Sequence, residues 1–162
     1  MRNVISMFVV ISSLIFMASS IRAEDETLFS EASFSMSQDR LHDLILETGQ
    51  NIVISKNVVR FNFGEVNLLC ISDANADRMR IISPIAKVEE LEQQQLVLAL
   101  MANFHTALDV RYAIREGVIY AAFIHPLSPL TDQQVYSAIS QVASANRTFG
   151  KEYSSGELVF NN

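Results

Sequence analysis

Residues 89–108 (EELEQQQLVLALMANFHTAL) place the strongest constraint on how this chain folds. Acidic and amide side chains fill the first turns, which suits the positive end of a helix dipole. Further along, apolar residues recur at the i, i+4, i+7 and i+11 spacing of a buried helical stripe: Val97, Met101, Phe104 and Leu108. Other apolar residues widen this stripe to most of the circumference: Leu96, Leu100 and Ala107. We therefore predict one long helix that needs cover on more than one side, from its own sheet and from a second copy of the chain.

Asn103 is the polar exception on this apolar surface. A buried amide without hydrogen-bond partners costs ~1–3 kcal/mol, so a partner is expected. We interpret Asn103 as a structural polar residue that ties the helix to the backbone of a neighbouring strand or cap. Binding of a ligand by its amide is the alternative.

The first 23 residues have the three parts of a secretory signal peptide. Arg2 gives a short basic region, residues 4–18 are apolar, and residues 19–23 are mostly small. Cleavage is expected after Ala23, with cleavage after Ser20 as the alternative. The other interpretation is an uncleaved membrane anchor, but the apolar run is shorter than the roughly 20 residues that usually span a bilayer.

Removal of residues 1–23 would take away Arg2 and Arg22 and no acidic residue. Ten basic and 18 acidic residues would remain, a net charge of −8. This acidity argues against a nucleic-acid partner and against an anionic membrane surface after signal cleavage. We expect a periplasmic or secreted protein with three further parts: a flexible leader (24–34), one domain (35–150) and a C-terminal tail (151–162).

Periodicity within the domain predicts three helices and about five strands. A capping-box pattern at Ser35 and Gln38 begins the first helix, which ends near Gly49, and Thr131 with Gln134 begins the last. Residues 52–55 are a short β-prone piece, and apolar alternation or turn residues mark the predicted strands: 58–63, 66–72, 78–85, 110–115 and 118–125. The order α-β-β-β-α-β-β-α predicts an α+β fold with an antiparallel sheet and helices mainly on one face.

Motifs for catalysis or cofactor binding are missing from the sequence. It has no HExxH, CxxC, GxSxG or glycine-rich phosphate loop. Cys70 has the parity of a strand core, so we expect a buried thiol. His105 and Asp109 have helical spacing for a metal or a base–orienter pair, but a local helix-end contact is commoner. We therefore expect a protein that is not an enzyme and has no cofactor or metal.

Five arginines fall on the outward faces of the predicted strands. The simplest interpretation is that they are solvated sheet residues. The alternative is a basic stripe for an acidic peptide, formed by Arg60, Arg78, Arg80, Arg111 and Arg115.

The element order resembles the type III secretion chaperone-like fold and, within it, the YbjN family of bacterial sensory transduction regulators. The resemblance covers residues 35–150 and includes three local pieces: 100–104 (LMANF), 116–120 (EGVIY) and 126–131 (PLSPLT). It implies a homodimer that binds an extended stretch of another polypeptide without chemistry. The signal peptide departs from the secretion chaperones, which work in the cytosol, so their effector-chaperone role is not carried over.

We therefore expect an exported, chaperone-like, protein-binding or regulatory module that is homodimeric. The residues expected to bind protein lie on the long helix: Leu96, Leu100, Met101 and Phe104. One alternative is a small-molecule sensor or carrier with a pocket lined by Tyr112, Tyr120 and Phe104. Another is a hydrolytic enzyme that uses His105 or His125.

Overall fold

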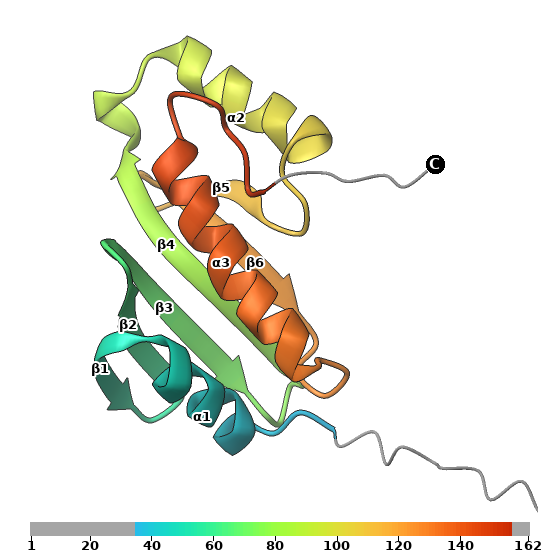
Figure 1. The fold of residues 1–162 in the computed structure, drawn as a ribbon. Coiled ribbons are helices and arrows are strands. Elements are labelled where there is room, and N and C mark those ends of the chain that lie inside the picture. Colours follow the sequence, from blue (N-terminus) through green and yellow to red (C-terminus); the bar gives the residue numbers. More distant parts are fainter. Residues whose placement is uncertain (1–34, 157–162) are drawn as a thin grey trace, which may run out of the picture. The chain divides into compact units, whose positions relative to one another are not determined.

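Residues 35–156 are the part of the chain that the structure, a computed structural model, describes (Figure 1). They form one antiparallel sheet of six strands in the order β1-β2-β3-β4-β6-β5. The helices are α1 (Gln38–Thr48), η1 (Val88–Glu90, a 3-10 helix), α2 (Gln93–His105) and α3 (Asp132–Thr148). The strands are β1 (Gln50–Ser55), β2 (Val58–Phe63), β3 (Val66–Asp73), β4 (Arg78–Lys87), β5 (Arg111–Arg115) and β6 (Val118–His125). The predicted signal peptide and leader lie outside the described residues.

The predicted α+β class with three α-helices is confirmed, but the predicted count of about five strands is wrong. Residues 50–55 form a sixth strand, β1, so the order is α-β-β-β-β-α-β-β-α. β1 pairs with β2 across a turn in which Lys56 has a φ of 54°. Nearly every side chain of β1 is exposed, on both faces of the strand. The strand therefore lacks the apolar–polar alternation from which a half-buried strand is recognised.

The core lies between one face of the sheet and the helices α1 and α3 (Figure 1). α3 packs against β3, β4 and β6, and α1 packs against α3 and β2. α2 contacts β5 at one end of the strand order. Both helices bury large apolar residues at helical spacing: Leu41, Leu44 and Ile45 from α1, and Val135, Ile139 and Val142 from α3. The other face of the sheet carries no helix of the described residues.

The helix ends combine predicted and unpredicted contacts. Thr131 and Gln134 form the predicted capping box of α3. α1 is capped by the side chain of Ser37, two residues later than predicted. Gly49 is extended, with φ −90°, and not left-handed. Glycine is required there by space, since an added Cβ would lie 2.8 Å from Cδ2 of Phe61.

β4 lies between β3 and β6, so Pro84 falls in a central strand and not in an edge strand, where proline is usually found. The ladder between β4 and β6 shifts register between Pro84 and Ala86, and such a bulge tolerates the missing proline N–H. Asn146 of α3 donates from Nδ2 to the Pro84 carbonyl and to Oγ of Ser83, each at 2.9 Å. The helix thereby stabilises the irregular part of the strand.

The domain's packing continues past Gly150. Tyr153 and Ser155 are both buried. The ring of Tyr153 contacts the rings of Phe149 and Tyr112 edge to face, with centroids 5.2 and 6.1 Å apart. Thr106, at the end of α2, donates from Oγ1 to the Tyr153 carbonyl at 2.6 Å. Residues 151–156 therefore help to hold α2 against the rest of the domain.

Candidate protein-binding surface

α2 (Gln93–His105) is shorter than the helix predicted over residues 89–108, because the chain turns before Gln93. η1 ends at Glu90, and Glu92 is extended with φ −74° and ψ 147°. Glu92 and Gln95 then form a capping box: Gln95 Oε1 accepts from the Glu92 backbone N–H at 2.9 Å. This reciprocal pair satisfies two donors that a helix start leaves open, and it fixes where α2 begins.

The large apolar side chains of α2 point to solvent and the small ones to the sheet. The predicted buried stripe is therefore wrong for three of its members, since Val97, Met101 and Phe104 are 46%, 53% and 85% exposed. Ala99 and Ala102 are the buried residues of the helix. The small alanine side chains let the helix approach β5 closely. Because the helix is apolar on most sides, its sequence has no periodic pattern that shows which side faces the sheet.

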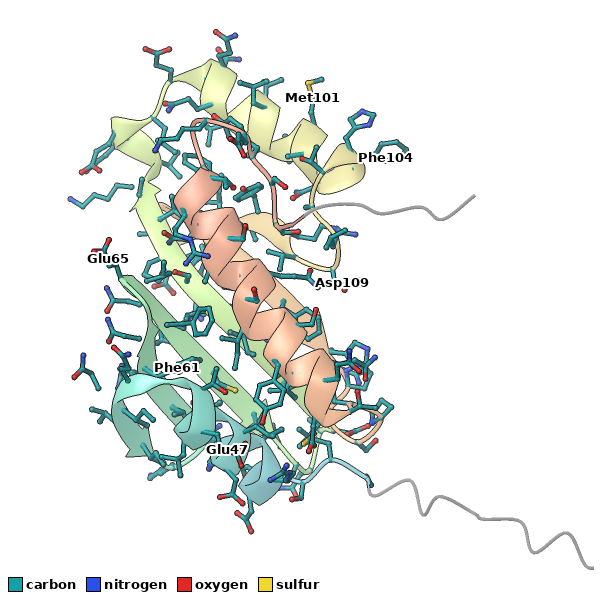
Figure 2. The ribbon with its side chains drawn as sticks, in the orientation of Figure 1. Glu47, Phe61, Glu65, Met101, Phe104 and Asp109 are labelled. Atoms are coloured by element: carbon teal, nitrogen blue, oxygen red, sulfur yellow. The ribbon has the colours of Figure 1, made fainter. Side chains whose placement is uncertain are left out.

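We call the solvent-exposed residues Val97, Leu100, Met101 and Phe104 the outer face of α2. Leu100 is 67% exposed. Figure 2 shows Met101 and Phe104 pointing away from the body of the domain. No helix within residues 35–156 is long and apolar enough to cross a membrane. The outer face is an exposed apolar surface, and surfaces of this kind mark sites of contact with proteins or membranes.

A mostly apolar groove of about 290 Å³ lies beside the outer face, between α2 and the hairpin of β5 and β6. Leu96, which packs against the core, and Leu100 line it from the helix. Ile114 lies opposite and is 55% exposed. The full lining is Leu96, Ala99, Leu100, Tyr112, Ala113, Ile114 and Ile119. Of the predicted protein-binding residues, the groove brings together Leu96 and Leu100, while Met101 and Phe104 lie on the outer face.

Asn103 joins α2 to β5, the edge strand at this end of the sheet. Its Oδ1 accepts from the Tyr112 backbone N–H at 2.7 Å, and its Nδ2 donates to the Tyr112 carbonyl at 3.1 Å. The amide thus occupies both backbone groups that Tyr112 would offer to an added strand. β5 is therefore closed at its centre to strand addition.

β1 is the outer strand at the other end of the sheet. None of residues 35–156 pairs as a strand with its outer edge. Val53 and Ile54 are 57% and 48% exposed. An uncovered edge strand with apolar side chains is a template for pairing with another chain.

The three aromatic residues expected to line a small-molecule pocket do not meet. Tyr112 is buried on the helix side of the sheet and donates from its hydroxyl to the Ala145 carbonyl at 3.0 Å. Burial raises the pKa of the Tyr112 phenol. Tyr120 pairs with Ala113, the neighbour of Tyr112, so its side chain lies on the opposite face of the sheet. Phe104 is on the outer face of α2.

The residues considered for catalysis make ordinary structural contacts. Asp109 (Figure 2) pairs with Gln141, whose Nε2 donates to Oδ2 of Asp109 at 3.1 Å. His125 stacks on Phe123 with ring centroids 5.8 Å apart. Cys70 is buried, and loss of solvation raises the pKa of its thiol to about 12. In the described part of the chain, no group of three or more His, Cys, Asp or Glu side chains is placed to hold a metal ion.

Comparison with solved structures gives a likeness of fold. A chain in the structure of the HopA1-SchA chaperone-effector complex matches with a TM-score of 0.53 and 18% identity, over 67% of this chain and 88% of that one. A chain in the ExsC-ExsE complex matches with a TM-score of 0.44 and 13% identity, over 64% and 77%. No protein-family model matches the sequence, and no curated protein does. The first of these matches shows a fold similar to that of a chain in the chaperone-effector complex.

Proposed function

We propose that this protein is a non-enzymatic binding module that holds another polypeptide. The outer face of α2 carries the proposal, because four large apolar side chains there are 46–85% exposed within residues 35–156. The likeness of fold to a chain from a chaperone-effector complex supports it. Membership of the YbjN family, export through residues 1–23, and a periplasmic or secreted location belong to the same proposal as sequence-based predictions.

The outer face of α2 pairs with the same face of a second copy. A two-fold dimer is self-complementary, so one apolar helix face with an adjacent groove is sufficient to build it. In this arrangement Met101 and Phe104 of one protomer pack over the groove of its partner. The capping box at Glu92 and the bonds of Asn103 hold the helix rigid, which lowers the entropic cost of pairing.

The client polypeptide adds as a strand to the outer edge of β1. Backbone hydrogen bonds to an edge strand give affinity that does not depend on the client's side chains. Exposed Val53 and Ile54 provide apolar contacts on both faces of the added strand. The two interaction surfaces lie at opposite ends of the strand order, so pairing of two copies leaves the client edge accessible.

Cysteine cross-linking tests the pairing of α2. Cys70 is buried and its thiol pKa is raised, so an introduced cysteine is the only readily reactive thiol among the described residues. Mild oxidation of the Met101→Cys variant should give covalent dimers. Glu47→Cys, on the exposed side of α1, is the matched control and should stay monomeric (Figure 2). Equal cross-linking of the two variants would contradict the proposed interface.

A further inference from the structure

The helix-free face of the sheet carries a different surface, built from the side chains that alternate with the core. Its register places five residues in one row across five strands: Arg60, Leu69, Ile82, Ala122 and Arg111. Directly opposed residues of antiparallel strands share a face, so this row has a guanidinium at each end and aliphatic side chains between them. The neighbouring row has one guanidinium among three aliphatic side chains: Val58, Ile71, Arg80 and Ile124.

A depression of about 170 Å³ lies in this face. Its floor is apolar, and Ile124 within it is 59% exposed. Arg80 and Arg115 also line it, together with one carboxylate, Glu116. Its lining is Ile71, Arg80, Ile82, Ala113, Arg115, Glu116, Tyr120, Ala122 and Ile124. The depression is thus mostly apolar, with two guanidinium groups and one carboxylate in its lining.

The arginines of this face are only partly neutralised by the protein itself. Arg115 pairs with Glu116 at 3.1 Å, and Arg111 donates to the carbonyls of its own loop. Arg60 and Arg80 are exposed and make neither an ion pair nor a side-chain hydrogen bond with any of residues 35–156. The chain as a whole has a net charge of −6, so this basic surface runs against the overall balance.

We propose that this face binds an acidic segment of the polypeptide partner, with apolar side chains between its carboxylates. The inference builds on the proposed function and names the chemistry of the partner. Guanidinium groups bind carboxylates in a bidentate geometry, while the aliphatic floor takes the apolar side chains. A nucleic acid would need a continuous basic track or several stacking aromatic residues, whereas Arg80 is flanked in its row by Ile71 and Ile124, and the depression holds one aromatic residue, Tyr120.

The geometry of the sheet sets the spacing that the segment needs. Arg60 on β2 and Arg111 on β5 are four strand steps apart in the row, about 19 Å at the usual separation of neighbouring strands. An extended segment that crosses the strands covers this distance in about six residues. Acidic residues about six positions apart, with aliphatic residues between them, therefore match the face.

Fluorescence polarisation tests the inference with the purified protein and a labelled peptide of about twelve residues, with glutamates spaced as above and valine or leucine between them. A peptide with glutamine in place of glutamate is the matched control. The acidic peptide should bind more tightly, and its affinity should fall as salt is raised. Equal binding of both peptides, or stronger competition by a single-stranded oligonucleotide than by unlabelled acidic peptide, would overturn the inference.

Substitutions locate the site. Arg60→Gln and Arg80→Gln should each weaken binding of the acidic peptide by about two- to fivefold, as loss of an exposed ion pair does. Arg147→Gln on α3 is the basic control and should bind as the wild type does. Leu100→Glu should also bind normally, since it lies on α2. If the wild-type protein pairs through α2 but does not bind the acidic peptide, this inference alone is wrong. If it binds the acidic peptide but does not pair, only the proposed dimer is wrong.

Discussion

Replacing Leu100 with glutamate separates pairing from folding. Leu100 is 67% exposed on the outer face of α2, so a charged side chain at this position stays in water in the isolated protomer. Glutamate is also a good helix former. The free energy of unfolding of the protomer should therefore change by no more than about 0.5 kcal/mol, as for other surface substitutions.

The effect on pairing is much larger. Full burial of a leucine side chain is worth about 1.5–3 kcal/mol, and the exposed two thirds of Leu100 account for roughly 1–2 kcal/mol of that. A two-fold interface contains the residue twice, so about 2–4 kcal/mol of dimer stability is lost. The dimer dissociation constant should rise on the order of 30- to 1000-fold. The cost of burying the new charge adds to this figure.

Light scattering over a dilution series measures the dissociation constant of the dimer. Urea unfolding at low protein concentration measures the free energy of unfolding of the protomer. Leu46→Glu is the matched control, because Leu46 is a leucine on a helix with 51% exposure but lies on α1. It should leave the dissociation constant unchanged. If Leu100→Glu unfolds the protomer, or if both variants weaken pairing equally, the assignment of the interface to α2 is refuted.

Three further predictions concern the framework. Asn103→Ala removes both bonds to the Tyr112 backbone and should lower the free energy of unfolding by ~1–3 kcal/mol in urea; an unchanged value would show that water replaces the amide. Hydrogen bonds from Ser128 lower the pKa of Asp77, so its contribution to stability is complete above the ordinary pKa of 3.8 and is lost as pH falls through the lowered value. The difference in Tm between wild type and Asp77→Ala should therefore shrink in acid, and a constant difference would contradict this. Cys70 should react with a thiol reagent at pH 8 only after unfolding; rapid labelling of the folded protein would contradict its burial.

Local signals in the sequence predicted much of the sheet and of the helix caps. β2 and β6 have the predicted bounds, because each combines apolar residues with a turn. The capping box at Thr131 depends only on residues three positions apart, so sequence is sufficient to find it. Three exposed arginines of the helix-free face, Arg60, Arg80 and Arg111, also follow from strand parity alone, since each is next to a core residue in its strand.

The parts that sequence could not predict depend on tertiary contacts. The sequence marks residues 52–55 as β-prone, and they lie in β1; but β1 is exposed on both faces, so it is the hydrogen bonds to β2 that show it to be a full strand of the sheet. The central position of β4 follows from its pairing with β6, far along the chain. On α2, Ala99 faces the sheet and Phe104 faces solvent, because small side chains permit close packing at the edge of a sheet. Hydrophobicity alone favours the opposite orientation.

The candidate surface on residues 96–104 stays a prediction, and the structure gives it a different physical basis from the predicted one. An over-apolar helix predicted a need for cover on several sides, whereas α2 buries its small residues and leaves the large ones on the surface. The spacing of the arginines and aliphatic residues across the sheet required the register of five strands. No sequence pattern contains that register.

Sedimentation equilibrium of the purified wild-type protein, at concentrations on the order of tens of micromolar, tests most directly whether the outer face of α2 is a surface for protein contact. We predict that the wild-type protein has the mass of two chains and falls to the mass of one chain on dilution. The Leu100→Glu variant should not reach the mass of two chains. A strict monomer across the whole range would mean that Phe104 and its neighbours are exposed without a second copy to cover them. The proposed pairing through α2 would then be wrong.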